Sequence, residues 1–424
     1  CKALIIGLQK RGAVVGSSLN TAYLLERLSQ TLERLETLMA IFVSNRYLPR
    51  RILLLTGCFA RAAAERHSIS RLWKQSSRLI SRSITQNAGD HGEHYITRDK
   101  KEYWAMFYSA AGGGVLIALM ALFKIYLGSI IDDKVWKGIA EGLNYGLGFM
   151  VIFMLHFTVA TKQPAMTAAR FAEAVEKTPQ GKSVNMKLAQ LLVDVFRSQS
   201  IAVLGNVLIA MGLAALIAFG FQYKTGEPLM NADQIAYQLH SIDPFAGTLW
   251  FAAIAGVWLF CSGIISGYFD NRSNYLNMRM RLAQHPLLKK LMSEKTRVKF
   301  ANYMHENYGS LIGNLCFGML LGITGVVGYL THLPLDIRHV AFSSANVGYI
   351  AVSGHFTYSL LLQCIAFVLL IGLVNLIVSF SLTLWVALRS LNAEIESWWP
   401  IWHEVCQIVK KRPLSLFLPV QLDK

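Results

Sequence analysis

Residues 104–131 read WAMFYSAAGGGVLIALMALFKIYLGSII, a run of 28 residues in which Lys124 is the only charged side chain. A helix crosses the hydrocarbon core of a bilayer in about 20 residues, so this run is long enough to span a membrane. Five further apolar runs follow it, at 142–161, 201–221, 246–268, 308–330 and 360–388. The sequence therefore predicts an all-α, polytopic membrane protein with about six transmembrane helices.

The composition of the whole chain agrees with this class. Of 424 residues, 54% are hydrophobic and only 16% are charged, whereas soluble domains carry about 25% charged residues. This balance excludes a disordered chain, a coiled-coil rod and most large soluble enzymes. The formal net charge is nevertheless +16, which needs an explanation in topology or in an anionic partner.

Basic residues alternate between the two sides of the predicted spans. Of the 41 Lys and Arg residues, 36 lie in four segments, at 1–103, 162–200, 269–307 and 389–424. The intervening loops at 132–141, 222–245 and 331–359 carry only four, and Lys124 lies inside a span. Because cytoplasmic loops carry the excess of Lys and Arg, both termini are predicted to be cytoplasmic. Topology then accounts for most of the positive charge.

The chain divides into three predicted parts. Residues 1–103 form a cytoplasmic, basic helical region, with helices at 19–44 and 52–84 and a polar linker at 87–101. Because the chain begins at Cys1, we expect this region to be the end of a longer one. Residues 104–388 form the transmembrane domain, and residues 389–424 form a cytoplasmic tail.

Polar residues inside the predicted spans have two interpretations each. Lys124 either reaches toward the outer interface or faces a pathway, and His156 either serves a proton relay or packs between helices. Four asparagines, one in each of four spans, either line a polar cavity or bind helices together; they are Asn144, Asn206, Asn314 and Asn375. The external segment 331–359 is either a re-entrant or interfacial segment or a plain surface loop.

Three Gly-x-x-x-Gly motifs, Gly142–Gly146, Gly263–Gly267 and Gly318–Gly322, let helix backbones approach closely. They serve either packing within the chain or a homodimer. The 269–307 loop is a basic strip suited to anionic lipid headgroups, although it could also contact the phosphates of nucleic acid. The expected partners are therefore the lipid bilayer, its anionic headgroups and a small-molecule or lipid ligand, with little support for nucleic acid.

Sequence motifs for cofactor or metal chemistry are missing. The six cysteines show no C-x-x-C spacing, and His91 and His94 are a lone pair in a polar linker. Neither a G-x-x-x-x-G-K-[ST] phosphate loop nor a G-x-S-x-G elbow occurs. Gly112, Gly113 and Gly114 lie inside the first span and predict close packing or a kink. We expect no cofactor and no metal.

Several longer motifs resemble one bacterial family. They are GLNYGLG at 142–148, HFTVATKQPAMT at 156–167, SGIISGYFDNR at 262–272, SSANVG at 343–348, GLVN at 372–375 and WVALR at 385–389. They are similar to the multi-pass membrane proteins called the site-specific recombinase (gonococcal-recombinase-like) family. The resemblance, over about residues 100–390, implies a Gram-negative inner-membrane protein with a longer helical N-terminal region.

The family name implies DNA recombination, but the residues that this chemistry needs are not evident. None of the eleven histidines begins an H-x-x-R motif, and no catalytic motif was found. The leading hypothesis is therefore a non-enzymatic inner-membrane protein for ligand or lipid binding, transport or scaffolding, and the alternative is a site-specific DNA recombinase. The candidate ligand-binding residues are Lys124, His156, Lys162, Asp270, Asn271, Arg272 and Asn346.

Overall fold

The computed structural model describes residues 19–42, 99–160, 182–353, 356–391 and 397–419, with short pieces within 4–8, 49–60, 96–97 and 167–175 and at residue 395. All regular elements in these ranges are helices. They belong to two compact units, each described separately below. The larger comprises residues 88–266, 309–388 and 392–424, and the smaller comprises residues 1–87, 267–308 and 389–391.

Five of the described helices are long and apolar enough to cross a membrane. They are α5 (Lys100–Ile130), α8 (Lys182–Thr225), α10 (Thr248–Tyr275), α13 (Glu294–Thr331) and α15 (Tyr358–Leu391). The protein is thus an all-α polytopic protein. A shorter helix, α6 (Lys134–Met154), covers part of the predicted span 142–161. That span was placed too far along the chain, because residues 157–159 have left the helix.

Helix α6 folds back along α5 as a hairpin. The connection is three residues long, and Asp133 caps α6 by accepting hydrogen bonds from the N–H groups of Val135 and Trp136. Near the connection the Lys124 ammonium lies 3.4 Å from the Glu141 carboxylate. At the far end the Ser109 hydroxyl donates to the His156 carbonyl oxygen, at 3.1 Å. Helix α6 therefore runs antiparallel to α5 over most of its apolar length.

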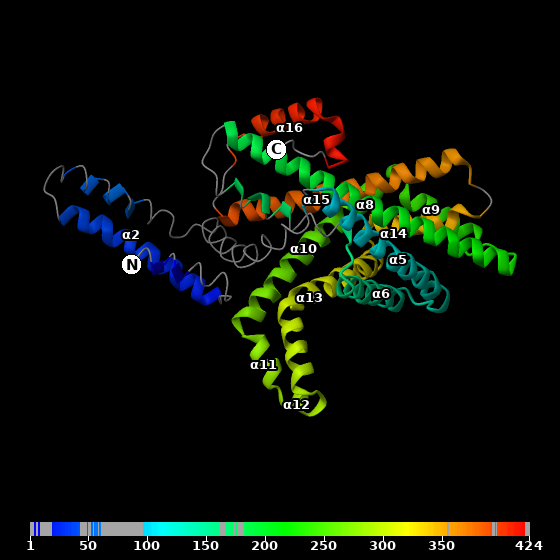
Figure 1. The fold of residues 1–424 in the computed structure, drawn as a ribbon, viewed down its shortest axis with the longest axis horizontal. Helices are drawn as coiled ribbons and strands as arrows, with labels where there is room; N and C mark the ends of the chain where they lie inside the picture. Colours follow the sequence, from blue (N-terminus) through cyan, green and yellow to red (C-terminus); the bar gives the residue numbers. More distant parts are fainter. Residues whose placement is uncertain are drawn as a thin grey trace. The chain divides into compact units, whose positions relative to one another are not determined.

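Helix α8 runs parallel to α5. Gly205 lies against Phe107, and further along both helices Gly114 lies against Ala210. Helices α5 and α8 can begin at the same end of the bundle only because α6 returns the chain to that end. Figure 1 shows α5, α6 and α8 together in the larger unit.

Helices α10, α13 and α15 repeat this arrangement. Helices α10 and α13 are antiparallel, because the Trp258 indole N–H donates to the Thr324 hydroxyl (2.7 Å) while Gly313 lies against Ser266. Helices α10 and α15 are parallel, because Asn375 binds the carbonyl oxygen of Ala252 while Gly256 lies against Val378. The helices α5–α6–α8 and α10–α13–α15 therefore form two three-helix repeats.

The second helices of the two repeats contact each other in opposite directions. Gly146 of α6 meets Gly318 of α13, and Gly142 meets Gly322. These two Gly-x-x-x-Gly motifs therefore pack within the chain, which confirms that interpretation for both of them. A homodimer through Gly263–Gly267 stays a prediction. Because α6 and α13 are antiparallel, the two repeats have inverted orientation.

Exposed aromatic side chains mark both ends of the bundle. At the end where α5 finishes, each helix carries one; they are Tyr126, Trp136, Tyr223, Trp250, Tyr329 and Tyr358. At the other end Trp104 of α5 and Trp385 of α15 are exposed. Aromatic side chains collect at the two membrane–water interfaces, so this distribution agrees with a membrane-spanning bundle that includes α6.

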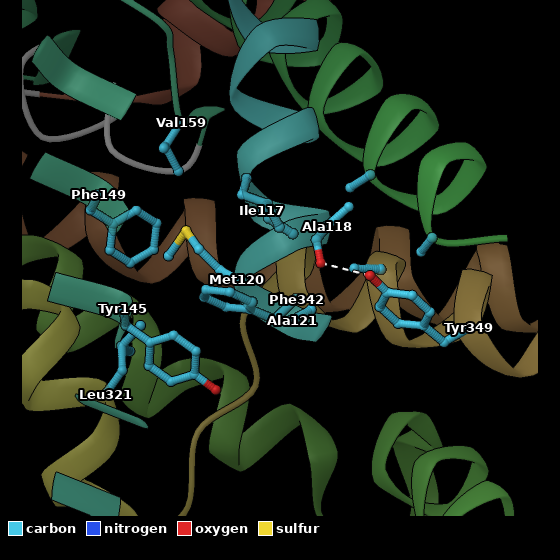
Figure 2. Packing of buried hydrophobic residues seen from close by; sticks show 14 of the residues in the cluster. Ile117, Ala118, Met120, Ala121, Tyr145, Phe149, Val159, Leu321, Phe342 and Tyr349 are labelled. Carbon is cyan, nitrogen blue, oxygen red and sulfur yellow. Dashed lines mark hydrogen bonds between the residues drawn. The ribbon is translucent and has the colours of Figure 1, made fainter. Parts of the chain in front are cut away.

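The segment between α13 and α15 enters the bundle. It contains the 12-residue helix α14 (Val340–Ala351), of which ten residues are buried. The Tyr349 hydroxyl donates to the Ala118 carbonyl oxygen at 2.7 Å, in the middle of α5 (Figure 2). Gly348 lies against Met211, near the middle of the apolar run of α8. Helix α14 is therefore buried inside the bundle, so the surface-loop interpretation is wrong for it, and a re-entrant position in the membrane stays a prediction.

The main core forms around α14. In Figure 2 the rings of Tyr145 and Phe149 from α6 lie near Phe342 of α14. The Tyr145 and Phe342 ring centroids are 4.4 Å apart. Leu321 of α13 and Met120 of α5 belong to the same buried cluster. In a membrane-spanning bundle such contacts stabilise the fold through close van der Waals packing between helices rather than through removal of apolar surface from water.

Short helices cover the two ends of the larger unit. They are α9 (Ala232–Ile242) and η2 (Pro244–Ala246) between α8 and α10, and α16 (Trp399–Lys411) and η3 (Pro413–Leu416) after α15. Helix α9 begins with a capping box between Asn231 and Gln234. Helix α16 and η3 both contact α8.

The smaller unit contains α2 (Leu19–Phe42), α11 (Met278–Gln284) and α12 (Pro286–Leu291). The predicted helix 19–44 is thus confirmed within two residues, whereas most of 52–84 lies outside the described residues. The Arg297 Nε–H donates to the Ala283 carbonyl oxygen (2.7 Å), and the Ser273 hydroxyl lies 3.0 Å from His305 Nδ1. These bonds join the ends of α10 and α13 into a basic helical hairpin.

Candidate functional site

Two irregular segments of the larger unit pack inside it, and each follows the second helix of a repeat. The first junction is residues 157–160, which follow α6. The second junction is residues 333–339, which follow α13. Each begins after a histidine with left-handed backbone conformation: His156 has φ 57° and His332 has φ 54°. Non-glycine residues rarely adopt this conformation, so the chain turns sharply out of both helices in the same unusual way.

Asn206 of α8 holds the first junction. Its side-chain amide donates hydrogen bonds to the carbonyl oxygens of Ala110 (2.5 Å) and Thr158 (2.9 Å). Its Oδ1 accepts a hydrogen bond from the Ala160 N–H at 2.8 Å. Asn206 is 1% exposed. One buried side chain therefore satisfies the hydrogen bonds of three backbone groups. Inside a membrane no water is available to bind these groups instead.

Asn375 of α15 holds the second junction in the same way. Its amide donates to the carbonyl oxygens of Ala252 (2.7 Å) and Arg338 (3.0 Å), and its Oδ1 accepts from the Val340 N–H (3.2 Å). In both repeats the asparagine lies on the third helix. The asparagine side chain donates to one backbone carbonyl of the first helix and to one backbone carbonyl at the junction. It also accepts a hydrogen bond from the backbone N–H two residues after that junction carbonyl. We call Asn206 and Asn375 the two clamps.

Small residues make room for both junctions. A Cβ atom on Gly113 would lie 2.5 Å from the Thr158 carbonyl oxygen, and one on Gly112 would meet the Phe157 ring. At the second junction a Cβ atom on Gly328 would meet the Leu335 backbone. The close-packing interpretation of residues 112–114 is therefore confirmed.

An ion pair connects α5 and α6 beside the core. Lys124 and Glu141 have side-chain exposures of 36% and 14%, and the ammonium lies 5.7 Å from the centroid of the Tyr145 ring. Lys124 thus meets a carboxylate of its neighbour. Ionisable groups inside a membrane bundle carry a large desolvation cost and are often functional.

A second ion pair lies on the second junction. The Arg338 guanidinium is 2.5 Å from the Asp336 carboxylate, and its Nε–H donates to the Ser241 carbonyl oxygen at 2.8 Å. Arg338 also lies 5.4 Å from the Phe251 ring centroid. Asp336 and Arg338 directly precede α14, and the Phe342 ring of α14 contacts the Tyr145 ring beside Lys124. Both ion pairs therefore lie near α14.

His339 ends the second junction inside an aromatic cage. Its ring centroid lies 5.7 to 6.1 Å from the rings of Phe149, Phe317 and Phe342. The residue is 1% exposed and stands directly before α14. Burying an isolated charge there would be costly, so the cage favours a neutral imidazole.

The predicted ligand-binding residues occupy different parts of the molecule. Lys124 pairs with Glu141, whereas exposed His156 marks the opposite end of the α5–α6 hairpin, about 22 Å away along α5. Asn346 is half-buried on α14. Asp270, Asn271 and Arg272 belong to the smaller unit, and Lys162 lies outside the described residues. Their meeting at one site stays a prediction.

The four span asparagines bind backbone at separate places. Asn144 donates to the Met120 carbonyl oxygen (2.9 Å), and Asn314 donates within its own helix to Ser310 (2.9 Å). With the two clamps these contacts support the interpretation that the asparagines hold the structure together.

Sequence reasoning missed Glu141 and the internal repeat. Lys124 and Glu141 lie at similar distances along the chain from the α5–α6 connection, one before it and one after it. In an antiparallel hairpin such residues face each other, so this spacing could have predicted the ion pair. The repeat also has a signal: residues 142–156 and 318–332 each contain Gly-x-x-x-Gly and a histidine ten residues after the second glycine. Among the described residues, no group of three metal-ligating side chains occurs.

Comparisons with known proteins identify a family without adding a mechanism. Neither a curated protein nor a solved structure matches the chain. The sequence profile of a family described as "Site-specific recombinase" matches residues 1–419. The chain belongs to the site-specific recombinase family.

Proposed function

We propose that this protein is an integral membrane protein that binds a ligand inside its bundle and moves it across the bilayer. The observation that carries the proposal is the correspondence of the two clamps, group for group, in two repeats of inverted orientation. Inverted repeats with broken helices are a common architecture of secondary transporters, whose ligand sites lie near the bilayer midplane between the repeats.

The second junction and α14 supply the ligand site in this proposal. Irregular backbone at membrane depth is tolerated only where protein buries it or where it lines a cavity. The Lys124–Glu141 and Asp336–Arg338 pairs place both signs of charge near α14. Such pairs suit a polar or charged ligand, which would exchange its own charged groups for one partner of a pair.

The proposed topology has six crossings. Helix α6 is the sixth, because parallel helices α5 and α8 need a return crossing between them. An even number of crossings puts both termini on one side, and the distribution of basic residues makes that side cytoplasmic. We propose the bacterial inner membrane as the location, with anionic headgroups at the basic loops.

Access to α14 from both sides of the membrane tests the proposal without knowledge of the ligand. In a variant whose six cysteines are replaced by serine, Asn346→Cys would be treated with a membrane-impermeant maleimide. Vesicles of both orientations would be used. Alternating access predicts labelling from each side. Tyr358→Cys, 91% exposed at one end of the bundle, and Lys101→Cys, exposed at the other, are controls that each react from one side. Labelling of Asn346→Cys from one side only, or from neither, would contradict transport.

Native mass spectrometry would identify the ligand class. Protein purified from its own membrane after a high-salt wash should retain a small molecule or lipid. Glu141→Gln should lose this molecule, while Asp233→Asn on exposed α9 should keep it. His156→Ala and Asp270→Ala test the predicted site residues in the same way.

The family description gives the alternative, a site-specific DNA recombinase acting through the basic hairpin. That function predicts nucleic acid that survives the salt wash, and DNA affinity that falls steeply with salt. Lys289→Gln/Lys290→Gln in α12 would weaken the affinity. Strand exchange by the purified protein would replace transport as the proposed function.

A further inference from the structure

We infer that α16 and η3 form a docking surface for anionic phospholipid at the membrane face where α5 begins. The surface is defined by the exposed side chains of Trp399, Trp402, Lys410, Lys411, Arg412 and Leu414. The inference is independent of the proposed transport, because no residue of this surface belongs to the clamps or the ion pairs.

The two faces of α16 differ in what they contact. Ile401 is 1% exposed, and the helix contacts α8. On the other side Trp399 and Trp402 are 77% and 54% exposed, and Lys410 follows them at helical spacing. A soluble surface rarely presents two tryptophans beside a basic cluster, whereas an interfacial helix presents this combination to a bilayer.

Hydrogen bonds fix the position of this surface along the axes of the bundle helices. The Tyr103 hydroxyl donates to the Phe417 carbonyl oxygen at 2.7 Å, and the Arg197 guanidinium donates to the Ser415 carbonyl oxygen at 3.5 Å. Tyr103 directly precedes the apolar run of α5. The segment after α16 therefore lies level with the start of a span, where exposed Trp104 marks the interface.

Arg197 connects the segment after α16 to α8 and to the residues that precede α5. The residue is 4% exposed, pairs with Asp194 at 2.9 Å and donates to the Thr97 carbonyl oxygen at 2.6 Å. Because α8, the start of α5 and the segment after α16 meet at this arginine, the docking surface is a fixed part of the larger unit.

The charge of the surface selects the lipid. Lys410, Lys411 and Arg412 are consecutive and exposed, and no acidic residue occurs between 405 and 422. Each basic residue close to an anionic surface strengthens binding about fivefold. Tryptophan rings anchor at headgroup depth without distinguishing lipid charge. Anionic phospholipid therefore fits both parts of the surface.

Quenching by brominated lipid tests this inference. The full chain would be reconstituted in vesicles of phosphatidylglycerol and phosphatidylcholine, with bromine on only one of the two lipids in each preparation. Trp399→Phe/Trp402→Phe isolates the signal of these two tryptophans from the other seven. We expect that signal to be quenched at least about twofold more by brominated phosphatidylglycerol. The preference should fall as salt is raised.

Charge variants separate lipid selection from simple insertion. Lys410→Gln/Lys411→Gln/Arg412→Gln should abolish the preference while both brominated lipids still quench. Lys289→Gln/Lys290→Gln, in the smaller unit, is the matched control and should leave the preference unchanged. Equal quenching by the two lipids in the unaltered protein, or none by either, would overturn the inference. So would a copurifying acidic protein that the triple variant loses and that shields both tryptophans from lipid.

Discussion

The two junctions share one clamp but differ in what the clamp holds. Asn206 fixes residues 157–160, which pack against the glycines of α5. Asn375 fixes a connection that leads into a 12-residue helix at the centre of the bundle. The bonding pattern is the same, yet among the described residues only the second junction carries an ion pair and a buried histidine. The comparison separates a shared structural element from features that one copy alone shows in the described part of the chain.

Removal of a clamp should have the largest effect. Asn206→Leu or Asn375→Leu leaves one backbone N–H and two carbonyl oxygens without their partner. Each unsatisfied buried group costs about 1–3 kcal/mol, so we expect a loss of about 3 kcal/mol or more for either variant. Equilibrium unfolding in mixed micelles measures it. Asn314→Leu, which removes one bond within its own helix, is the control and should cost less than about 1.5 kcal/mol.

Similar losses at the two clamps would confirm that they are structurally equivalent. A loss at one clamp with no change at the other would show that the correspondence is geometric only.

A methyl group at the first junction should have the next largest effect. Gly113→Ala places a Cβ atom against the Thr158 carbonyl, which the Asn206 side-chain amide holds in place. Overpacking of this kind costs about 1–3 kcal/mol. Gly212→Ala, on α8 with no atom within 4 Å of the added carbon, should instead stabilise the protein by up to about 1 kcal/mol. Thermal midpoints of the two variants that shift in the same direction would contradict the packing of the first junction.

The ion pair beside α14 should respond to single and double changes differently. Lys124→Met or Glu141→Gln leaves a partly buried charge without its partner and should cost about 1–2 kcal/mol, less than for a fully buried pair. Lys124→Met/Glu141→Met removes both charges and should cost less than either single change. A double-mutant cycle measures the coupling energy, and strictly additive losses would show that the pair contributes nothing.

Removal of the backbone strain at the two left-handed histidines should have the smallest effect. Glycine adopts positive φ without the Cβ penalty, so His156→Gly and His332→Gly should each stabilise the protein by roughly 0.5–1 kcal/mol. Equal gains would sharpen the comparison of the junctions. A loss at His156 would instead show that its side chain makes stabilising contacts that outweigh the strain of the turn.

The sequence predicts the helices well and the junctions poorly. Apolar length located all six helices of the bundle, because hydrophobic runs of this size have few alternatives in a folded chain. The end of α6 was misplaced because FTVA at 157–160 is as apolar as a helix end, and no local pattern shows that it packs as irregular backbone. The sequence places Asn206 and Asn375 inside two predicted spans. Their shared role depends on partners up to 123 residues away.

The candidate site was predicted only in fragments. Lys124 and Asn346 stand out as polar residues near apolar runs, whereas Glu141 lies one residue before the predicted span, where a charged residue is ordinary. Asp336, Arg338 and His339 lie in the segment 331–359, where polar residues are equally ordinary for a loop. Their burial follows from the descent of the second junction into the bundle, which tertiary packing determines.

The placement of α14 constrains the order in which the chain is assembled. Twelve residues are about 18 Å long, too short to enter the bilayer as a span of their own. The partners of α14 include α5, which is synthesised early, and Asn375 on α15, which is synthesised after α14 itself. The contacts of α14 can therefore be completed only after α15 has been translated, so folding of the bundle includes a docking step that follows the synthesis of α15.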